Sequence, residues 1–165
     1  MRTGLGGLFG ILLVVGTVCH AQTESHKYFL YKAVGEHLQA FADESRIAGM
    51  IRVESGWKQG ARNRRSGARG LGQFMPSTAD WMERAYRLQL GGYSRYSARW
   101  SILATTLFMK DLLGDGTGKK SFAPTCIRWS RALAHYSGGS HGYQDRVFAA
   151  EHYYLRIGWR GVPVC

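Results

Sequence analysis

The sequence predicts a mostly α-helical protein that folds as a single domain with little or no β-sheet. Apolar residues recur at steps of three and four along most of the chain, and no segment shows a sustained alternation with a period of two. The 165 residues are 45% hydrophobic and 13% aromatic, which is enough to bury a sizeable core. This composition argues against a disordered chain.

The first residues have the pattern of a secretory signal peptide. Arg2 precedes a long uncharged apolar run, and small residues follow it. Because glycines weaken the hydrophobicity of the run, we expect residues 1–21 to be cleaved off. Residues 22–165 would then be the mature domain in the periplasm. The alternative is a retained inner-membrane anchor over residues 3–23, with the domain facing the periplasm.

Export has a consequence for the cysteines. Cys19 would leave with the signal peptide, so that Cys126 and Cys165 remain. An oxidising compartment favours a disulfide between them. For a loop of that size the chain-entropy model gives a stabilisation of about 4 kcal/mol. Two free thiols in a reducing cytoplasm are the alternative if the protein is not exported.

The apolar periodicity predicts six helices in the rest of the chain. They cover residues 26–41, 45–55, 76–90, 98–114, 126–137 and 143–157. Ser77, followed by Asp80 and preceded by Pro76, resembles a capping box at the start of the third helix. A loop rich in glycine and arginine covers residues 55–72, and a linker covers residues 114–125.

The chain is strongly basic, with a net charge of +11. Such a surface favours polyanions, which include nucleic acid, an anionic membrane and an acidic polymer such as a cell wall. Part of the charge is concentrated in the long loop, at Arg62, Arg64, Arg65 and Arg69. Charge alone does not choose among these partners.

Glu54 stands on the apolar stripe of the second expected helix, in register with Ile47, Met50 and Ile51. Burial raises the pKa of a carboxyl group, and the negative end of the helix dipole acts in the same direction. A carboxyl group that keeps its proton near neutral pH can act as a general acid. A glutamate that reaches solvent at a frayed helix end would give the same pattern, so the stripe alone leaves both interpretations open.

Two later segments carry groups suited to binding a sugar polymer. GLGQFMPSTA, residues 70–79, combines glycines that allow close backbone approach with the amide of Gln73 and the apolar side chain of Met75. AHYSGG, residues 134–139, presents Tyr136 at a helix end before a glycine turn. Each segment alone has an ordinary structural explanation.

Taken together, the Glu-Ser pair at 54–55, GLGQFMPSTA and AHYSGG, in this order, resemble the soluble lytic transglycosylase family. The resemblance runs from about Glu36 to Tyr154 and includes WSILATTLFM at 100–109. It implies a lysozyme-like α fold related to goose-type lysozyme, and cleavage of the MurNAc–GlcNAc bond of peptidoglycan. The compact form is similar to versions found in bacteriophages and in specialised secretion systems.

The resemblance carries over to individual residues. Glu54 matches the single catalytic acid and base of the family, and Ser55 matches the serine that contacts substrate beside it. Gln73 and Met75 match residues of the substrate cleft. Tyr136 matches a tyrosine whose hydroxyl lies near the glutamate.

The sequence also departs from the family pattern. Ser137 stands where the family usually has asparagine, and residues 58–60 replace a usual Asn-Pro. The later tyrosine motif is matched only loosely around Tyr143 and Tyr153, so neither receives a role from the resemblance.

A single carboxylate implies a reaction without water. Protonated Glu54 would give its proton to the glycosidic oxygen and then take the proton of the C6 hydroxyl of MurNAc, which closes on C1 to leave a 1,6-anhydro end. This chemistry requires no metal or cofactor, and the six histidines lack a metal-binding spacing such as HExxH. We expect a monomer that acts on peptidoglycan strands, alone or with a secretion-system or phage assembly.

Two other functions stay open. A hydrolytic muramidase usually needs a second carboxylate, for which Asp43, Glu44 and Asp80 are candidates. A non-catalytic basic protein that binds the wall or nucleic acid would use the arginine-rich loop and tolerate the loss of Glu54. The signal peptide argues against nucleic acid, and beside a cleft the same arginines would attract the acidic stem peptides of peptidoglycan.

Overall fold

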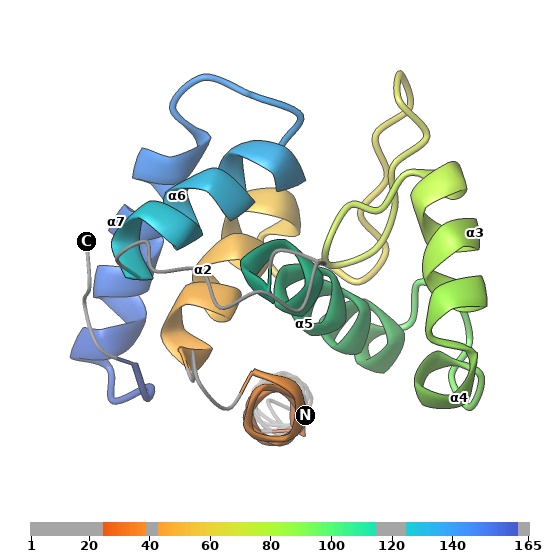
Figure 1. Cartoon of the computed structure of the whole chain (residues 1–165), viewed down its shortest axis with the longest axis horizontal. Coiled ribbons are helices and arrows are strands. Elements are labelled where there is room, and N and C mark those ends of the chain that lie inside the picture. Colours follow the sequence, from red (N-terminus) through yellow and green to blue (C-terminus); the bar gives the residue numbers. More distant parts are fainter. Residues whose placement is uncertain (1–24, 39–42, 115–124, 162–165) are drawn as a thin grey trace, which may run out of the picture.

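The computed structural model describes residues 25–38, 43–114 and 125–161. A first helix covers residues 25–37. The others are α2 (Glu44–Ser55), α3 (Pro76–Ala85), α4 (Arg87–Leu90), α5 (Ala98–Gly114), α6 (Thr125–Tyr136) and α7 (Tyr143–Arg156). Figure 1 shows their arrangement.

The regular secondary structure within these ranges is helical. The β pairing there is limited to isolated bridges of Arg69 with Arg62 and Phe74. The mostly α fold predicted from the sequence is therefore confirmed. None of the helices in the described part is long and apolar enough to cross a membrane. The expected signal peptide or anchor, over residues 1–23, and Cys165 lie outside the described residues.

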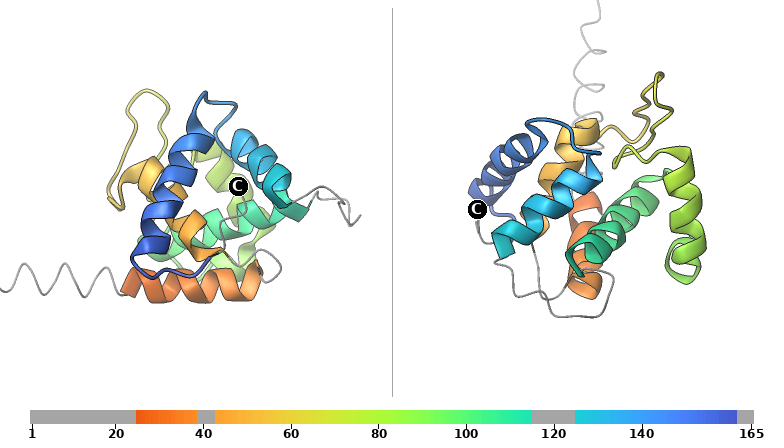
Figure 2. Two further views of the ribbon diagram at one scale, coloured as in Figure 1. Left: turned by 90° about the vertical axis from the view of Figure 1, so that its left-hand side faces the viewer. Right: turned by 45° about the horizontal axis from the view of Figure 1, so that its top comes forward.

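Helix α5 forms the centre of the fold. Helices α2, α6 and α7 lie on one side of it and α3 and α4 on the other (Figure 1). The helix at 25–37 crosses the base, whereas the loop over 56–75 and the turn between α6 and α7 rise at the opposite end (Figure 2). Trp100, Ile102 and Leu107 of α5 are fully buried. The core thus surrounds α5 and leaves the upper end of the molecule to the loops.

Helix α2 packs closely along α7, and a glycine makes this approach feasible. A Cβ atom on Gly49 would lie 2.9 Å from the carbonyl oxygen of Val147 and 3.1 Å from the backbone nitrogen of Glu151. Such distances are shorter than normal carbon contacts, so only glycine fits without a shift of α7. The contact fixes the position of α2, whose last turn carries Glu54.

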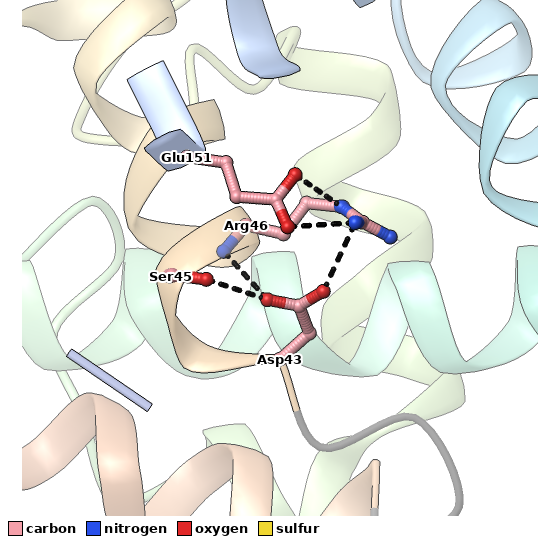
Figure 3. Close-up of polar contacts among 4 residues, drawn as sticks. All are labelled: Asp43, Ser45, Arg46 and Glu151. Atoms are coloured by element: carbon pink, nitrogen blue, oxygen red, sulfur yellow. Dashed lines mark hydrogen bonds and ion pairs between the residues drawn. The ribbon is translucent and has the colours of Figure 1, made fainter. Parts of the chain in front are cut away.

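A buried ionic network ties the start of α2 to α7 (Figure 3). Arg46 is fully buried and donates two hydrogen bonds to the carboxylate of Glu151, at 2.9 and 2.7 Å. Its guanidinium also lies 3.2 Å from Asp43, which accepts a hydrogen bond from the Ser45 hydroxyl at 2.7 Å. Burial raises the pKa of Asp43 to about 6, although Arg46 acts to lower it. Each buried charge therefore has a partner, as a low-dielectric interior requires.

Two predictions about residues 76–90 are wrong. The segment is not one helix, because it breaks at Tyr86 between α3 and α4. Ser77 does not cap the helix, which begins at Pro76 and has Met75 as an N-cap without a side-chain hydrogen bond. Proline suits the first helical position because that position has no intrahelical partner for an N–H group.

The break at Tyr86 has a tertiary cause. The Tyr86 hydroxyl donates to the carboxylate of Asp111 on α5, and its ring meets Trp81 edge-on. After the break Leu90 is buried, whereas Leu88 is 95% exposed. Apolar periodicity along the sequence contains no information about such a contact between helices.

Candidate active site

A cleft of about 640 Å³ opens between the loop over 56–75 and helices α6 and α7. The end of α2, Thr78 of α3 and Phe108 of α5 complete its walls. Four of the expected site residues, Glu54, Gln73, Met75 and Tyr136, line this cleft. Ser55 does not, because its hydroxyl turns back to donate to the Ile51 carbonyl at 3.1 Å.

Glu54 occupies the last turn of α2. Gly56 ends the helix in a left-handed conformation, φ 59°, and its N–H donates to the Arg52 carbonyl at 2.9 Å. Burial raises the pKa of the Glu54 carboxyl group, while Tyr143 and Arg146 act to lower it. The direction agrees with the shift predicted from the apolar stripe. Glu54 is also the only carboxylate among the residues that line the cleft in the described part of the chain.

Two tyrosines from consecutive helices stand beside Glu54. The hydroxyl of Tyr136, at the end of α6, donates to the Gly72 carbonyl at 2.8 Å. Its ring stacks on that of Tyr143, at the start of α7, with 6.4 Å between centroids and 18° between planes. Burial raises the pKa of both hydroxyls, and the nearby charge of Glu54 acts in the same direction. Both side chains are therefore neutral donors at physiological pH.

Tyr143 lines the cleft, although no role was assigned to it from the sequence. Its side chain is 4% exposed, and its hydroxyl lies close enough to Glu54 to lower the pKa of that carboxyl group. At the geometry of this structure the hydroxyl nevertheless completes no hydrogen bond within the described residues. A buried donor without a partner, aimed at a carboxylate, is uncommon in proteins and indicates a functional position. The hint in the sequence is the loose match of the family's later tyrosine motif around Tyr143, from which no role was assigned.

The segment around Gln73 forms the floor of the cleft. A Cβ atom on Gly72 would lie 2.5 Å from the Thr105 hydroxyl and 2.9 Å from that of Tyr136, so this position requires glycine. Gln73 has a positive φ of 48°. Its amide nitrogen donates to the carbonyls of Ala61 and Gly70, at 3.3 and 3.0 Å. The donors of this amide thus hold the loop together, and its carbonyl oxygen is the group that remains for a ligand.

Ser137, where the resemblance leads one to expect asparagine, also lines the cleft. Its hydroxyl donates to the Ala134 carbonyl at 3.2 Å and accepts from the Ser140 N–H at 3.2 Å. Ser137 therefore stabilises the turn that leads from α6 toward α7.

None of the three candidates for a second carboxylate lies in the cleft. Asp43 and Glu44 are at the opposite end of α2 from Glu54, about 15 Å away for ten residues of helix. They pair with Arg46 and Arg160 respectively, at 3.2 and 3.1 Å. Asp80 pairs with Arg95 at 2.6 Å. Its role is thus an ion pair rather than the helix cap that the sequence predicts.

The arginine-rich loop forms one wall of the cleft. Its tip is ordered by Asn63, whose side-chain oxygen accepts from the N–H groups of Arg65 and Ser66 at 3.0 and 3.1 Å. Arg62, Arg64 and Arg65 are exposed at this tip. The fourth arginine of the loop, Arg69, instead lies over the ring of Tyr96, 5.9 Å from its centroid. Asn63 and Ser66 themselves line the cleft, so the arginine side chains border it.

The described residues contain no group of three or more His, Cys, Asp or Glu side chains placed to hold a metal ion. The groups that line the cleft are one carboxyl group, the Arg146 guanidinium, the His135 imidazole, several hydroxyls, two amides and apolar side chains. Such a set can exchange one proton with a bound sugar and hold it by hydrogen bonds and apolar contact.

Comparison with known proteins gives one match. The family model for the transglycosylase SLT domain matches residues 35–151, which is more than half of the chain and includes the whole cleft. No curated protein and no solved structure matches the chain. The match agrees with the single, mostly α, lysozyme-like domain expected from the sequence motifs. The chain therefore belongs to the transglycosylase SLT domain family.

Proposed function

We propose that the protein is a peptidoglycan lytic transglycosylase that cleaves the MurNAc-β-1,4-GlcNAc bond without consuming water. Family membership supports peptidoglycan glycan strands as the substrate. One observation carries the mechanism: Glu54 is the only carboxylate that lines the cleft in the described part of the chain, and burial raises its pKa. One group must then serve as acid and as base.

The first step is protonation of the leaving group. Glu54 donates its proton to the glycosidic oxygen, and the bond between this oxygen and C1 of MurNAc breaks with both electrons moving to the oxygen. An oxocarbenium-like centre develops at C1, which the N-acetyl group of the same sugar can stabilise. Glu54 is left as a carboxylate.

The second step closes the ring. The Glu54 carboxylate removes the proton of the C6 hydroxyl, and the C6 oxygen forms a bond to C1. The product is a 1,6-anhydroMurNAc end, and Glu54 regains the proton it gave away. Because the C6 hydroxyl is already held near C1, this attack has an entropic advantage over capture of a free water.

The tyrosines have separate proposed roles. The Tyr143 hydroxyl, which completes no hydrogen bond within the described residues, would donate to the Glu54 carboxylate that forms after the first step. Tyr136 would keep the Gly72 segment in place through its 2.8 Å hydrogen bond. The carbonyl of Gln73 and the exposed thioether of Met75 would contact the sugars. Ser55 would need a rotamer change to reach them.

Hydrolysis is the nearest competing reaction, and it has less support. An inverting hydrolase places a second carboxylate roughly 6.5–9.5 Å from the acid to activate water, and a retaining one places it at about 5–5.5 Å. Asp43, Glu44 and Asp80 all form ion pairs with arginines outside the cleft. The lining residues of the described part thus offer no second carboxylate for either task.

The cellular setting is also a proposal. Export to the periplasm, through cleavage of residues 1–21 or with an anchor at 3–23, would bring the enzyme to its substrate. A Cys126–Cys165 disulfide would form in that compartment. We propose a monomer that acts by itself or within a secretion-system or phage assembly.

Replacement of the proposed acid tests the function. Glu54→Gln should lower the rate at which purified sacculi are solubilised by roughly 10²–10⁴-fold, the usual contribution of a general acid or base. Circular dichroism and thermal melting should show an unchanged fold. Glu36→Gln, the same change at an exposed site outside the cleft, is the control and should keep full activity. A Glu54→Gln protein that retains activity within about tenfold of the wild type would remove Glu54 from the mechanism.

A further inference from the structure

Arg146 is a cation in the cleft for which the proposed mechanism has no use. It projects from the first turn of α7 and lines the same cleft as Glu54. Its guanidinium lies 5.9 Å from the centroid of the Tyr143 ring and donates one long hydrogen bond, 3.4 Å, to the His141 carbonyl. It is close enough to Glu54 to lower the pKa of that carboxyl group.

The position of Arg146 differs from that of the paired arginines. Arg46, Arg95 and Arg160 each meet a carboxylate, at distances of 3.2 Å or less. Arg146 forms no ion pair with a carboxylate in the described part of the chain, and its side chain is exposed to the cleft. Its five N–H donors are therefore almost all free to meet a ligand.

In the cleft without a ligand, the charge of Arg146 works against the role of Glu54 as an acid. A positive charge beside a general acid favours loss of the proton that the acid must donate. A bound anion would compensate for that charge and remove the conflict. The other titratable side chains of the cleft cannot compensate for it, because the hydroxyls of Tyr136 and Tyr143 are neutral and the imidazole of His135 carries no negative charge. The anion must therefore come from the ligand.

We propose that Arg146 binds a carboxylate carried by the lactyl substituent of MurNAc, and that it thereby selects anionic glycan strands over uncharged ones. The inference rests on the proposed function, because it assumes that the strand occupies this cleft. MurNAc differs from GlcNAc by an ether-linked lactyl group, which ends in its own carboxylate or continues into a stem peptide that bears carboxylates. The planar guanidinium fork matches either carboxylate with two parallel hydrogen bonds.

The Tyr143 hydroxyl supports a ligand at this position independently. It is buried, faces the same cleft and completes no hydrogen bond within the described residues. Since its proposed partner is the Glu54 carboxylate that forms during the reaction, its position marks where the reacting sugar would lie. Tyr143 and Arg146 lie on the same turn of α7, so a sugar that brings its substituent to Arg146 approaches Tyr143 and Glu54 as well.

Binding measurements on an inactive protein test the proposal. In the Glu54→Gln background, calorimetry compares three ligands: an uncharged GlcNAc oligosaccharide, a bare glycan with free lactyl carboxylates, and a glycan with stem peptides. Arg146→Gln should weaken the binding of anionic glycan by about tenfold or more, the loss typical of a hydrogen bond between charged groups. The loss for the uncharged oligosaccharide should be much smaller. Arg146→Lys, which keeps the charge without the fork, should recover part of the affinity.

Arg156→Gln is the matched control, because Arg156 is an exposed arginine in the last turn of the same helix and does not line the cleft. It should leave all three affinities unchanged. Weakening of the bare glycan alone by Arg146→Gln would assign the contact to the free lactyl carboxylate, and weakening of the peptide-bearing glycan alone would assign it to the stem peptide. Weakening of both would mean that Arg146 binds either carboxylate.

Other results would overturn the inference. Arg146→Gln could weaken the binding of all three ligands equally, or of none of them, while the Glu54→Gln protein with Arg146 intact still binds glycan. Either result removes Arg146 as a carboxylate-binding residue and leaves the proposed function standing. If no glycan bound the background protein and the wild-type protein did not cut peptidoglycan, the proposed function would fail together with the inference.

Discussion

Glu54 is held between opposing influences, and their balance determines when it can act. Burial favours the protonated carboxyl group, whereas the Tyr143 hydroxyl and the Arg146 guanidinium favour the carboxylate. In the proposed mechanism, the acid step requires the protonated form and the ring closure requires the carboxylate. A carboxyl group with a raised pKa and a donor in reach can serve both steps without a second carboxylate.

Tyr143→Phe tests this balance. The change removes the hydroxyl beside Glu54 that acts to lower the pKa of this carboxyl group, so the pKa of Glu54 should rise further. The alkaline limb of kcat/KM, which reports loss of the Glu54 proton in the free enzyme, should therefore move to higher pH. The value of kcat should fall by about tenfold or more, because the carboxylate intermediate loses a hydrogen bond to a charged group.

Tyr153→Phe provides the control for that experiment. Tyr153 lies on the same helix, is 39% exposed and does not line the cleft. Its pH profile and kcat should match those of the wild type. If Tyr143→Phe also keeps the wild-type profile, the Tyr143 hydroxyl has no part in the reaction and its ring serves only to pack.

At the scale of helices, the site depends on how closely α2 approaches α7. Gly49→Ala places a methyl group 2.9 Å from the backbone oxygen of Val147, so α7 must move. We expect a loss of about 1–3 kcal/mol in the free energy of unfolding, the usual cost of overpacking. The melting temperature should fall by roughly 3–10 °C, and activity should fall with it as Glu54 and Tyr143 separate.

The same substitution at Gly35 is a control that should change the free energy of unfolding in the opposite direction. A Cβ atom there meets nothing within 4 Å, and the residue lies in the helix at 25–37. Gly35→Ala should raise the free energy of unfolding by about 0.5–1 kcal/mol through helix propensity alone. Equal effects at both positions would mean that the α2–α7 contact does not limit stability.

The sequence predicted α2, α5, α6 and α7 to within a residue or two, but it extended the first helix to residue 41, whereas that helix ends at residue 37. Periodicity located α2, α5, α6 and α7 because each packs an apolar face or is buried throughout. It missed the break at Tyr86, which follows from a hydrogen bond to Asp111 on another helix. It also assigned Asp80 to a cap, whereas Asp80 pairs with Arg95 fifteen residues later.

The sequence predicted those site residues that lie in local motifs and missed those that helix packing brings to the cleft. Glu54, Gln73, Met75 and Tyr136 belong to compact motifs whose residue types already suggest chemistry. Tyr143 and Arg146 lie in a segment whose apolar periodicity predicts an ordinary amphipathic helix. Their place beside Glu54 results from the packing of α7 on α2, which no local pattern encodes.

At the scale of the whole molecule, the positive charge is distributed unevenly around the cleft. Exposed arginines border it at the tip of the loop over 56–75, and Arg146 lies within it. Glu54 is the only acid among the lining residues of the described part. A field of this sign attracts an anionic polymer toward the cleft before any close contact forms.

Neutralising Arg62, Arg64 and Arg65 to Gln tests that long-range role. Binding to purified sacculi should weaken mostly at low salt, since the screening length falls from about 30 Å at 0.01 M to about 10 Å at 0.1 M. Turnover of short soluble glycans without stem peptides should barely change. Equal losses on both substrates at every salt concentration would place these side chains in the active site or in the fold.

Arg84, Arg87 and Arg156 serve as the matched control. All three are exposed and none lines the cleft, so their replacement by Gln produces the same net charge as the loop variant. The control should retain most of its low-salt binding to sacculi. If both triple variants lose binding equally, total charge rather than the loop attracts the wall.

The central claim, that one carboxylate performs the cleavage without water, is tested most directly by the chemical nature of the new ends. Purified peptidoglycan is digested with the wild-type protein, and the muropeptides are analysed by mass spectrometry without borohydride reduction. If Glu54 acts alone, the new ends should be 1,6-anhydroMurNAc, lighter by one water than the products of a lysozyme. Reducing MurNAc ends would contradict it, because they require an attacking water for which the cleft residues named here provide no second carboxylate.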